Sequence, residues 1–239
     1  METFFIVILS IFMFTNPKPN VNWQEKKSKI ESIKKKKKRR AAEIKSSVET
    51  MKTLLKRNKF NEKKLNKYAK AFHRYGMKHG VDINLILAVG FVESGYRNIH
   101  NEHGYEGTGV LQSLFRESHI RKFVRKTYHP KTRNYIKWAM KNPTKAINVS
   151  IWELSHFKKE YKRYIRFRCK FNWRWKKMLT PMSVDGKVRK DFKYLPFYNW
   201  GGNQCHTKKG SFPRHYPIKV MRTYRKIIKI VRERTKDAK

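Results

Sequence analysis

Any fold of this chain must accommodate 59 Lys and Arg side chains with only 17 Asp and Glu residues to balance them, a formal net charge of +42. Such a surplus implies a polyanionic neighbour, and nucleic acid, an anionic membrane and an anionic cell-wall polymer all qualify. Apolar residues still make up 39% of the 239 residues, too many for a chain that is disordered throughout. The sequence therefore predicts one basic globular domain of ordinary size with a charged arm.

The chain begins with a short apolar segment. Residues 4–14 read FFIVILSIFMF, and Thr15-Asn16-Pro17 ends the run. As a helix this segment would span about 16 Å, roughly half of a bilayer core. Its length suits a signal peptide, but no Lys or Arg precedes it and no small-residue cleavage site follows it. Residues 1–16 are thus either a signal-like segment or an anchor that inserts shallowly or packs on a partner.

A Lys/Arg-rich arm or linker is expected at residues 17–60. It contains KKKKKRR at residues 34–40, no glycine and few large apolar residues before Met51. This composition favours a solvated, weakly helical arm that contacts anionic membrane or wall polymers, with nucleic acid as a less favoured partner. Positive charge directly after a hydrophobic segment resists translocation. If the downstream domain works outside a membrane, ordinary export is therefore an awkward way to get it there.

Residues 61–239 show the regular apolar spacing of a mostly α-helical domain. Apolar side chains recur every three or four residues between Leu65 and Tyr75, which predicts an amphipathic helix. Gly80 can end that helix and Asp82 can cap the next one. Alternation typical of strands is scarce, so any sheet should be small.

The next helix is expected at residues 83–92, INLILAVGFV, which are apolar on nearly every side and should therefore be buried. Further helices are predicted to begin near Gly109, at Asn142-Pro143 and at about Pro217. The side chains of the last helix that should turn inward are Val220, Tyr224, Ile227, Ile228 and Val231.

Glu93 comes at the end of the buried helix, in AVGFVESGY at residues 88–96. Because desolvation disfavours a charged carboxylate, this position predicts a raised pKa for Glu93. A carboxylic acid that keeps its proton near neutral pH can protonate a leaving oxygen, as cleavage of a glycosidic bond requires. Taken alone, the position is more typical of a carboxylate that simply points outward from a last helical turn.

Three motifs follow Glu93 in order: GTGVLQ at residues 107–112, FYNWGG at residues 197–202 and YPIKV at residues 216–220. Each motif is unspecific by itself. In this order, over about residues 68–224, the set resembles the soluble lytic transglycosylases, which cleave peptidoglycan and have a lysozyme-like fold related to goose-type lysozyme. The hallmarks of that family are a Glu-Ser pair ending a buried helix, a Gly-Leu-Met-Gln stretch, an Ala-Tyr-Asn-x-Gly stretch and a tyrosine in the final helix.

The resemblance implies a site and a reaction. Glu93 would be the catalytic acid and base that cleaves the β-1,4 bond between N-acetylmuramic acid and N-acetylglucosamine, with formation of a 1,6-anhydro ring. Tyr198 would hold Glu93 by a hydrogen bond. The residues expected to bind glycan or support the site are Ser94, Leu111 (through the backbone around it), Gln112, Tyr198, Asn199 and Tyr216. No cofactor is implied. Phage virions and transfer machines use such domains for local wall opening. Together with the apolar segment and the basic arm, the resemblance implies a virion-associated or membrane-attached protein that acts on the cell wall or in the periplasm.

Glu106 departs from the family pattern, because it stands where the family usually has glycine. Most glycosidases use two carboxylates, so Glu106 is a possible second carboxylate that could position water. The protein would then be a hydrolytic muramidase, that is, a lysozyme. Phe197 and Trp200 flank the Tyr-Asn pair where a small residue precedes it in the family, so the groove could be reshaped.

A competing hypothesis from another class is a basic nucleic-acid-binding or structural virion protein with an inactive lysozyme-like domain. Residues 161–177 interleave aromatic and basic side chains, a pattern that suits stacking on bases as well as on sugar rings. Cys169 and Cys205 are too few for a disulfide scaffold and lack zinc-ligand spacing. The histidines show no metal-binding motif either, so no metal is expected.

Overall fold

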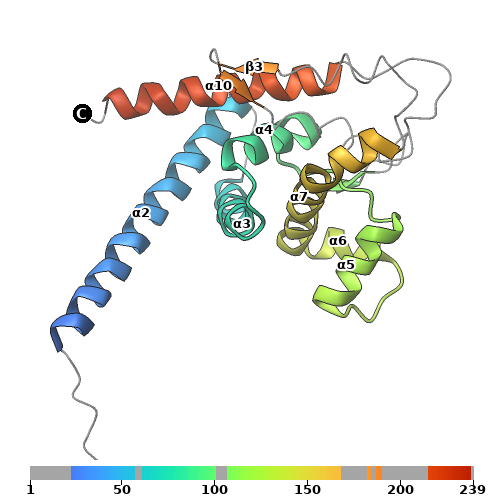
Figure 1. Ribbon diagram of the computed structural model, residues 1–239, viewed down its shortest axis with the longest axis horizontal. Helices are drawn as coiled ribbons and strands as arrows, with labels where there is room; N and C mark the ends of the chain where they lie inside the picture. Colours follow the sequence, from blue (N-terminus) through green and yellow to red (C-terminus); the bar gives the residue numbers. More distant parts are fainter. Residues whose placement is uncertain are drawn as a thin grey trace, which may run out of the picture. The chain divides into compact units, whose positions relative to one another are not determined.

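The protein is described here from a computed structural model, and its described residues are mostly helical (Figure 1), which confirms the mostly α prediction. The described ranges are 23–56, 61–100, 107–167, 182–184, 187–189 and 215–237. The elements, in chain order, are α2 (Trp23–Leu55), α3 (Glu62–His79), α4 (Ile83–Ser94), β1 (Ile99–His100), β2 (Thr108–Gly109), α5 (Ser118–Tyr128), α6 (Tyr135–Lys141), α7 (Pro143–Phe167), β3 (Met182–Val184), β4 (Lys187–Arg189) and α10 (His215–Asp237). The apolar segment at residues 1–16 lies outside these ranges.

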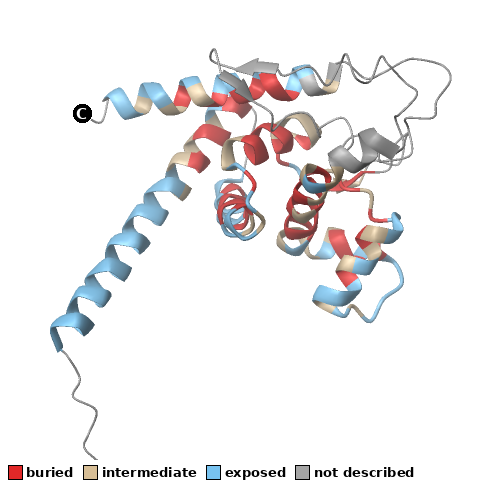
Figure 2. Cartoon of the chain, viewed as in Figure 1, coloured by how far each residue is buried: buried red, intermediate tan, exposed pale blue. Residues whose placement is uncertain are grey.

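The chain divides into two units, Met1–Glu43 and Ile44–Lys239. In the first unit, the part of α2 from Trp23 to Glu43 is exposed along its whole length (Figure 2). Its lysines and arginines, KKKKKRR included, are therefore fully solvated and cost the fold nothing in desolvation.

The second unit begins earlier than the arm boundary expected at residue 60, because the last turns of α2 belong to the core. Val48, Met51 and Leu54 are buried there. Side chains from other helices tie these turns down: the His73 ring bonds the Ser47 hydroxyl at 2.8 Å, and the Arg234 guanidinium donates to the Glu49 carbonyl at 3.1 Å.

The sequence signals at the ends of α3 and at the start of α4 act as expected. The Asn61 side chain accepts the Lys64 N–H at 3.0 Å and so caps α3. Gly80 ends α3 in the left-handed region, at φ 65°, and Asp82 caps α4 by accepting the Asn84 N–H at 2.9 Å. The predicted inner face of α3 is buried at Leu65, Tyr68, Ala69 and Phe72.

Helix α4 lies within the main core, as its sequence predicts, with residues 85–90 all buried. Helix α10 packs against it, and the Tyr224 hydroxyl donates to the Asp82 carboxylate at 2.7 Å, at the start of α4. Lys219 precedes Tyr224 in α10, yet it lines a pocket together with Phe91, which lies near the other end of α4. The two helices therefore run in opposite directions.

Helix α7 begins at Pro143, as predicted, and packs on α3. The side chains that it buries are Ile147, Ile151, Leu154 and Phe157. In α10 the predicted inward residues Val220, Tyr224 and Ile227 are buried, whereas Ile228 and Val231 are half-buried. A second, smaller apolar cluster joins α5, α6 and α7 around Phe115, Ile120, Val124, Trp138 and Val149.

The prediction of a helix that begins near Gly109 is wrong. Gly109 and Gln112 both have positive φ angles, 89° and 54°, which a helix does not tolerate. The chain instead makes a tight turn that pairs Thr108 with Ser113 through two backbone hydrogen bonds, of 3.0 and 3.1 Å. Helix α5 begins only at Ser118.

The buried end of α2 predicts which shortened proteins will fold. A protein that begins at Ile44 should unfold cooperatively in urea, because it keeps every buried residue of the second unit. A protein that begins at Asn61 loses Met51 and Leu54, which are 0% and 3% exposed, and should be destabilised by at least about 3 kcal/mol or fail to fold. Equal urea midpoints for the two proteins would contradict this assignment.

Candidate functional site

Glu93 lies in the last turn of α4, where the helix emerges from the core. Unlike residues 85–90 it is half-buried, so its side chain reaches the surface. The helix ends at Gly95, whose left-handed φ of 58° lets its N–H bond the Phe91 carbonyl at 3.0 Å. The carboxyl group is thus carried on a well-defined turn at the edge of an apolar core.

Ser94 connects this turn to the GVLQ motif. Its hydroxyl is buried and donates to the Val110 carbonyl at 2.7 Å. A β-carbon at Gly90 would come within 3.3 Å of the Leu111 side chain, so the glycine allows Leu111 to pack directly on the last turns of α4. The fold therefore brings the two motifs together. Leu111 itself is 0% exposed, so its side chain is a core residue, whereas the resemblance implies a glycan contact for the backbone around it.

Gln112 organises the hairpin of β1 and β2. Its amide nitrogen donates to the Ile99 carbonyl at 3.0 Å and to the Gly109 carbonyl at 2.6 Å. A β-carbon at Gly107 would lie 2.8 Å from the Gln112 side chain, so only glycine fits beneath it. The amide nitrogen expected to contact glycan is thus used to hold the hairpin, and the side chain is half-buried.

Tyr96 follows the last turn of α4 and is buried against that helix. Its hydroxyl donates to the Leu87 carbonyl at 2.9 Å, inside α4, and burial raises the pKa of Tyr96 well above its ordinary value. The phenol therefore stays neutral and serves as a fixed support for the end of α4.

Tyr216 is half-buried in the first turn of α10 and packs on the main core. Because α10 runs opposite to α4, this turn lies toward the end of α4 that carries Glu93. The other expected site residues, Tyr198, Asn199 and Glu106, lie outside the described residues, as do Phe197, Trp200 and both cysteines.

A buried acid that sequence analysis missed lies on α7. Glu153 is 2% exposed, and its Oε1 lies 3.6 Å from Nε2 of the His119 ring of α5. The other carboxylate oxygen has no hydrogen-bond partner among the described residues. The His119 ring stacks on His156 at 5.8 Å. The sequence did contain a signal for this acid, because Glu153 lies one helical turn before Phe157, on the face of the predicted helix that carries apolar residues.

Burial favours the neutral form of two histidines, His79 at the end of α3 and His156 on α7. Burial is the main cause that lowers the pKa of His79, although its hydrogen bond to Asn148 opposes the shift. Burial, followed by the neighbouring His119, lowers the pKa of His156. The Tyr128 hydroxyl, which also contacts Asn148, has its pKa raised to about 12 by burial.

Within the described residues, no cluster of three or more His, Cys, Asp or Glu side chains could hold a metal ion. None of the described helices is both long enough and apolar enough to cross a bilayer. Comparisons of the chain with models of protein families, with curated proteins and with solved structures found no match.

The Glu153 and His119 pair can be tested by a double-mutant cycle. His119→Ala should lower the free energy of unfolding by about 2 kcal/mol, because it leaves a buried carboxylate without its neighbouring ring. Adding Glu153→Gln should recover part of that loss, since a neutral amide costs less to bury. Additive effects of the two changes in urea unfolding would show that the groups do not interact.

The two neutral histidines predict acid sensitivity. A lowered pKa in the folded protein means that the unfolded chain takes up protons first as pH falls below the ordinary value of 6.5. Stability should therefore decrease between pH 7 and pH 5. The slope should be smaller in the double variant His79→Gln, His156→Gln, whereas His129→Asn, at an exposed histidine, should leave it unchanged. The test is the urea midpoint as a function of pH.

Proposed function

We propose that this protein is a lytic transglycosylase of lysozyme-like fold that cleaves the muramyl bond of peptidoglycan, with Glu93 as its acid and base. The observation that supports this best is the 2.7 Å hydrogen bond from Ser94 to Val110. It joins the ESGY turn to the GVLQ turn, the two motifs that share a role in the resembled family although they lie 16 residues apart.

The proposed reaction needs one carboxyl group. Protonated Glu93 donates its proton to the oxygen that joins N-acetylmuramic acid to N-acetylglucosamine, and the bonding electron pair leaves with that oxygen. Positive charge develops on the muramic ring. The Glu93 carboxylate then removes the proton from the 6-hydroxyl of the same sugar, and that oxygen attacks C1. The ring closes as a 1,6-anhydro sugar, and no water is consumed.

The surroundings of Glu93 suit this role. A catalytic acid has to be held in place and yet reach its substrate, and Glu93 is half-buried on a turn fixed by Ser94 and Gly95. Tyr216 lies toward the same end of α4 and would support the site from α10. We assign Tyr198 and Asn199 to the opposite wall of the groove on the family pattern alone.

The exposed arm fits a wall-directed enzyme. The first part of α2 presents the KKKKKRR run to solvent, where it can bind anionic membrane or wall polymers. Such an arm would keep the domain at one place on the envelope. Local wall opening by a virion or a transfer machine is the setting that we propose.

Digestion of purified sacculi tests the proposal. The wild-type protein should release muropeptides whose anhydro ends are lighter by one water, about 18 Da, than hydrolysed ends in mass spectrometry, because no water attacks. Glu93→Gln keeps the shape of the side chain but cannot donate the proton, so release should fall at least about 100-fold. Glu117→Gln, at an exposed glutamate, is the matched control and should stay active.

The alternative products have clear meanings. Hydrolysed reducing ends would identify a muramidase, and Glu106→Gln would then show whether that carboxylate positions the water. If no muropeptides are released and the protein binds DNA with an affinity that falls steeply with salt, the nucleic-acid-binding hypothesis replaces the enzyme hypothesis.

A further inference from the structure

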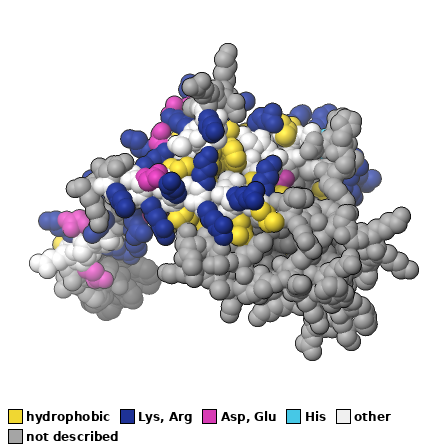
Figure 3. All heavy atoms as spheres, turned by 90° about the horizontal axis from the view of Figure 1, so that it is seen from above, with side chains coloured by type: hydrophobic (Ala, Val, Ile, Leu, Met, Phe, Trp, Pro, Cys, Tyr) yellow, Lys and Arg dark blue, Asp and Glu magenta, His cyan; other side chains and the backbone are white. Residues whose placement is uncertain are grey.

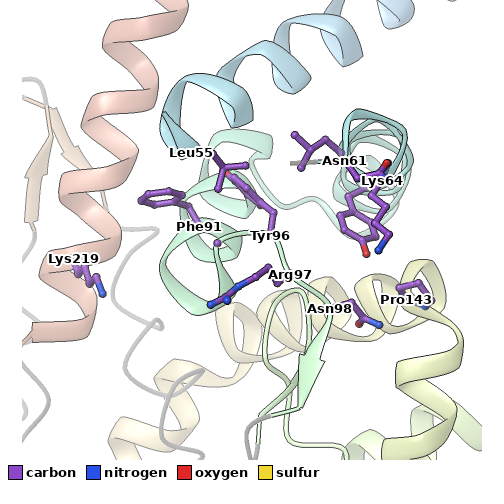
Figure 4. Close-up of a pocket in the computed structure, with 12 residues that line it drawn as sticks. Leu55, Asn61, Lys64, Phe91, Tyr96, Arg97, Asn98, Pro143 and Lys219 are labelled. Carbon is purple, nitrogen blue, oxygen red and sulfur yellow. The ribbon is translucent and has the colours of Figure 1, made fainter. Parts of the chain in front are cut away.

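A pocket of about 950 Å³ opens beside the last turn of α4 (Figure 4). Its walls come from the end of α2, from α3, from α4 and the segment after it, from the start of α7 and from α10. Phe91 and Gly95, on either side of Glu93 in the sequence, line it, but Glu93 does not. The pocket is therefore separate from the proposed catalytic acid, although one helical turn carries both.

The charged residues of this pocket are all cations. Lys64 comes from α3, Arg97 from the segment after α4 and Lys219 from α10, and no Asp or Glu is among the described lining residues. None of the three pairs with a carboxylate of the described chain. Glu62, the acid nearest to Lys64 in sequence, is instead paired with Lys52 at 2.9 Å.

The positions of two of these cations are constrained by the backbone. Arg97 donates from Nε to the Ser94 carbonyl at 3.0 Å, which fixes the stem of the side chain and leaves the terminal guanidinium nitrogens for a ligand. Lys64 lies in the first turn of α3, directly after the Asn61 cap. Pro143, the first residue of α7, also lines the pocket, so the positive end of that helix adds to the same field.

General basicity alone does not make such a site. On the face in Figure 3, Lys and Arg side chains are spread over the described surface, with few carboxylates among them. The pocket differs because its cations line a cavity that also has apolar walls, Leu55 and Phe91 among them. Figure 4 shows Lys64 on one side of this cavity and Lys219 on the other. Its volume is in the range of pockets that bind small organic ligands, about 300–1,000 Å³.

We propose that this pocket binds an organic dianion, a molecule whose phosphate monoester or paired carboxylates lie beside an apolar portion. Arg97 would bind the oxyanion through two parallel N–H groups, and Lys64 and Lys219 would add positive potential from opposite sides of the pocket. Leu55 and Phe91 would contact the apolar portion. The proposal does not depend on the catalytic role of Glu93.

Calorimetric titration in 150 mM NaCl tests this site with two probes, phenyl phosphate and phthalate. Both carry two negative charges next to a benzene ring, so the tighter of the two shows whether phosphate or carboxylate is preferred. We expect saturable binding at one site per chain for at least one probe. If neither binds, the proposal is overturned.

Matched variants separate the pocket from general electrostatics. Lys64→Ala with Arg97→Ala should weaken binding at least 10-fold, whereas Lys63→Ala with Lys67→Ala removes the same charge from exposed positions of α3 outside the pocket and should not. Lys219 lines the pocket from α10, so Lys219→Ala should also weaken binding. Equal affinity in the pocket and control variants would overturn the proposal. Thermal unfolding of each variant confirms that it is folded.

Discussion

The burial of α4 on every side is the constraint on which the arrangement of the second unit depends. A helix with apolar residues around its whole circumference cannot lie at a surface, so other elements must cover it. Helices α3 and α10 pack on it, and Leu111 packs against Gly90. Only the ends of α4 leave the core, which is why Asp82 can bond Tyr224 at one end and Glu93 reaches the surface at the other.

Covering α4 also explains the unexpected role of the GVLQ turn. A turn that packs on a buried helix has to satisfy its own backbone, and the Val110 carbonyl is satisfied by Ser94. Gln112 similarly supplies its amide nitrogen to two carbonyls of the hairpin. Family resemblance assigns these polar side chains to the ligand, whereas their hydrogen bonds serve the scaffold that holds Glu93. In the described part of the proposed site, Ser94 and Gln112 therefore position the turn that carries Glu93.

Local signals predicted most of the fold, because caps and helical periodicity depend on neighbours in sequence. Asn142-Pro143 marked the start of α7, and Gly80 marked the end of α3. The buried end of α2 was missed because the lysine-rich run before it set the expected boundary, although Ile44, Val48, Met51 and Leu55 recur at helical spacing. The contacts that hold this end, such as the bonds of Arg234 to Glu49 and Thr50, join residues far apart in sequence. The turn at Gly109 was mistaken for a helix because positive φ angles and pairing with Ser113 leave no periodic signal.

Charge and folding are largely separate in this protein. A cation costs little where it stays in water, and the exposed part of α2 uses this freedom for its KKKKKRR run. Polar groups inside the second unit have protein partners instead of water. Glu153 is buried against His119, and the Arg234 guanidinium donates hydrogen bonds to the Ser46 and Glu49 carbonyls. Since the part of α2 from Trp23 to Glu43 contributes no buried residue, its positive charge is not there for stability. The charge is best explained by what the protein binds. The same reasoning applies to the cations of the pocket beside α4, which pair with no carboxylate among the described residues.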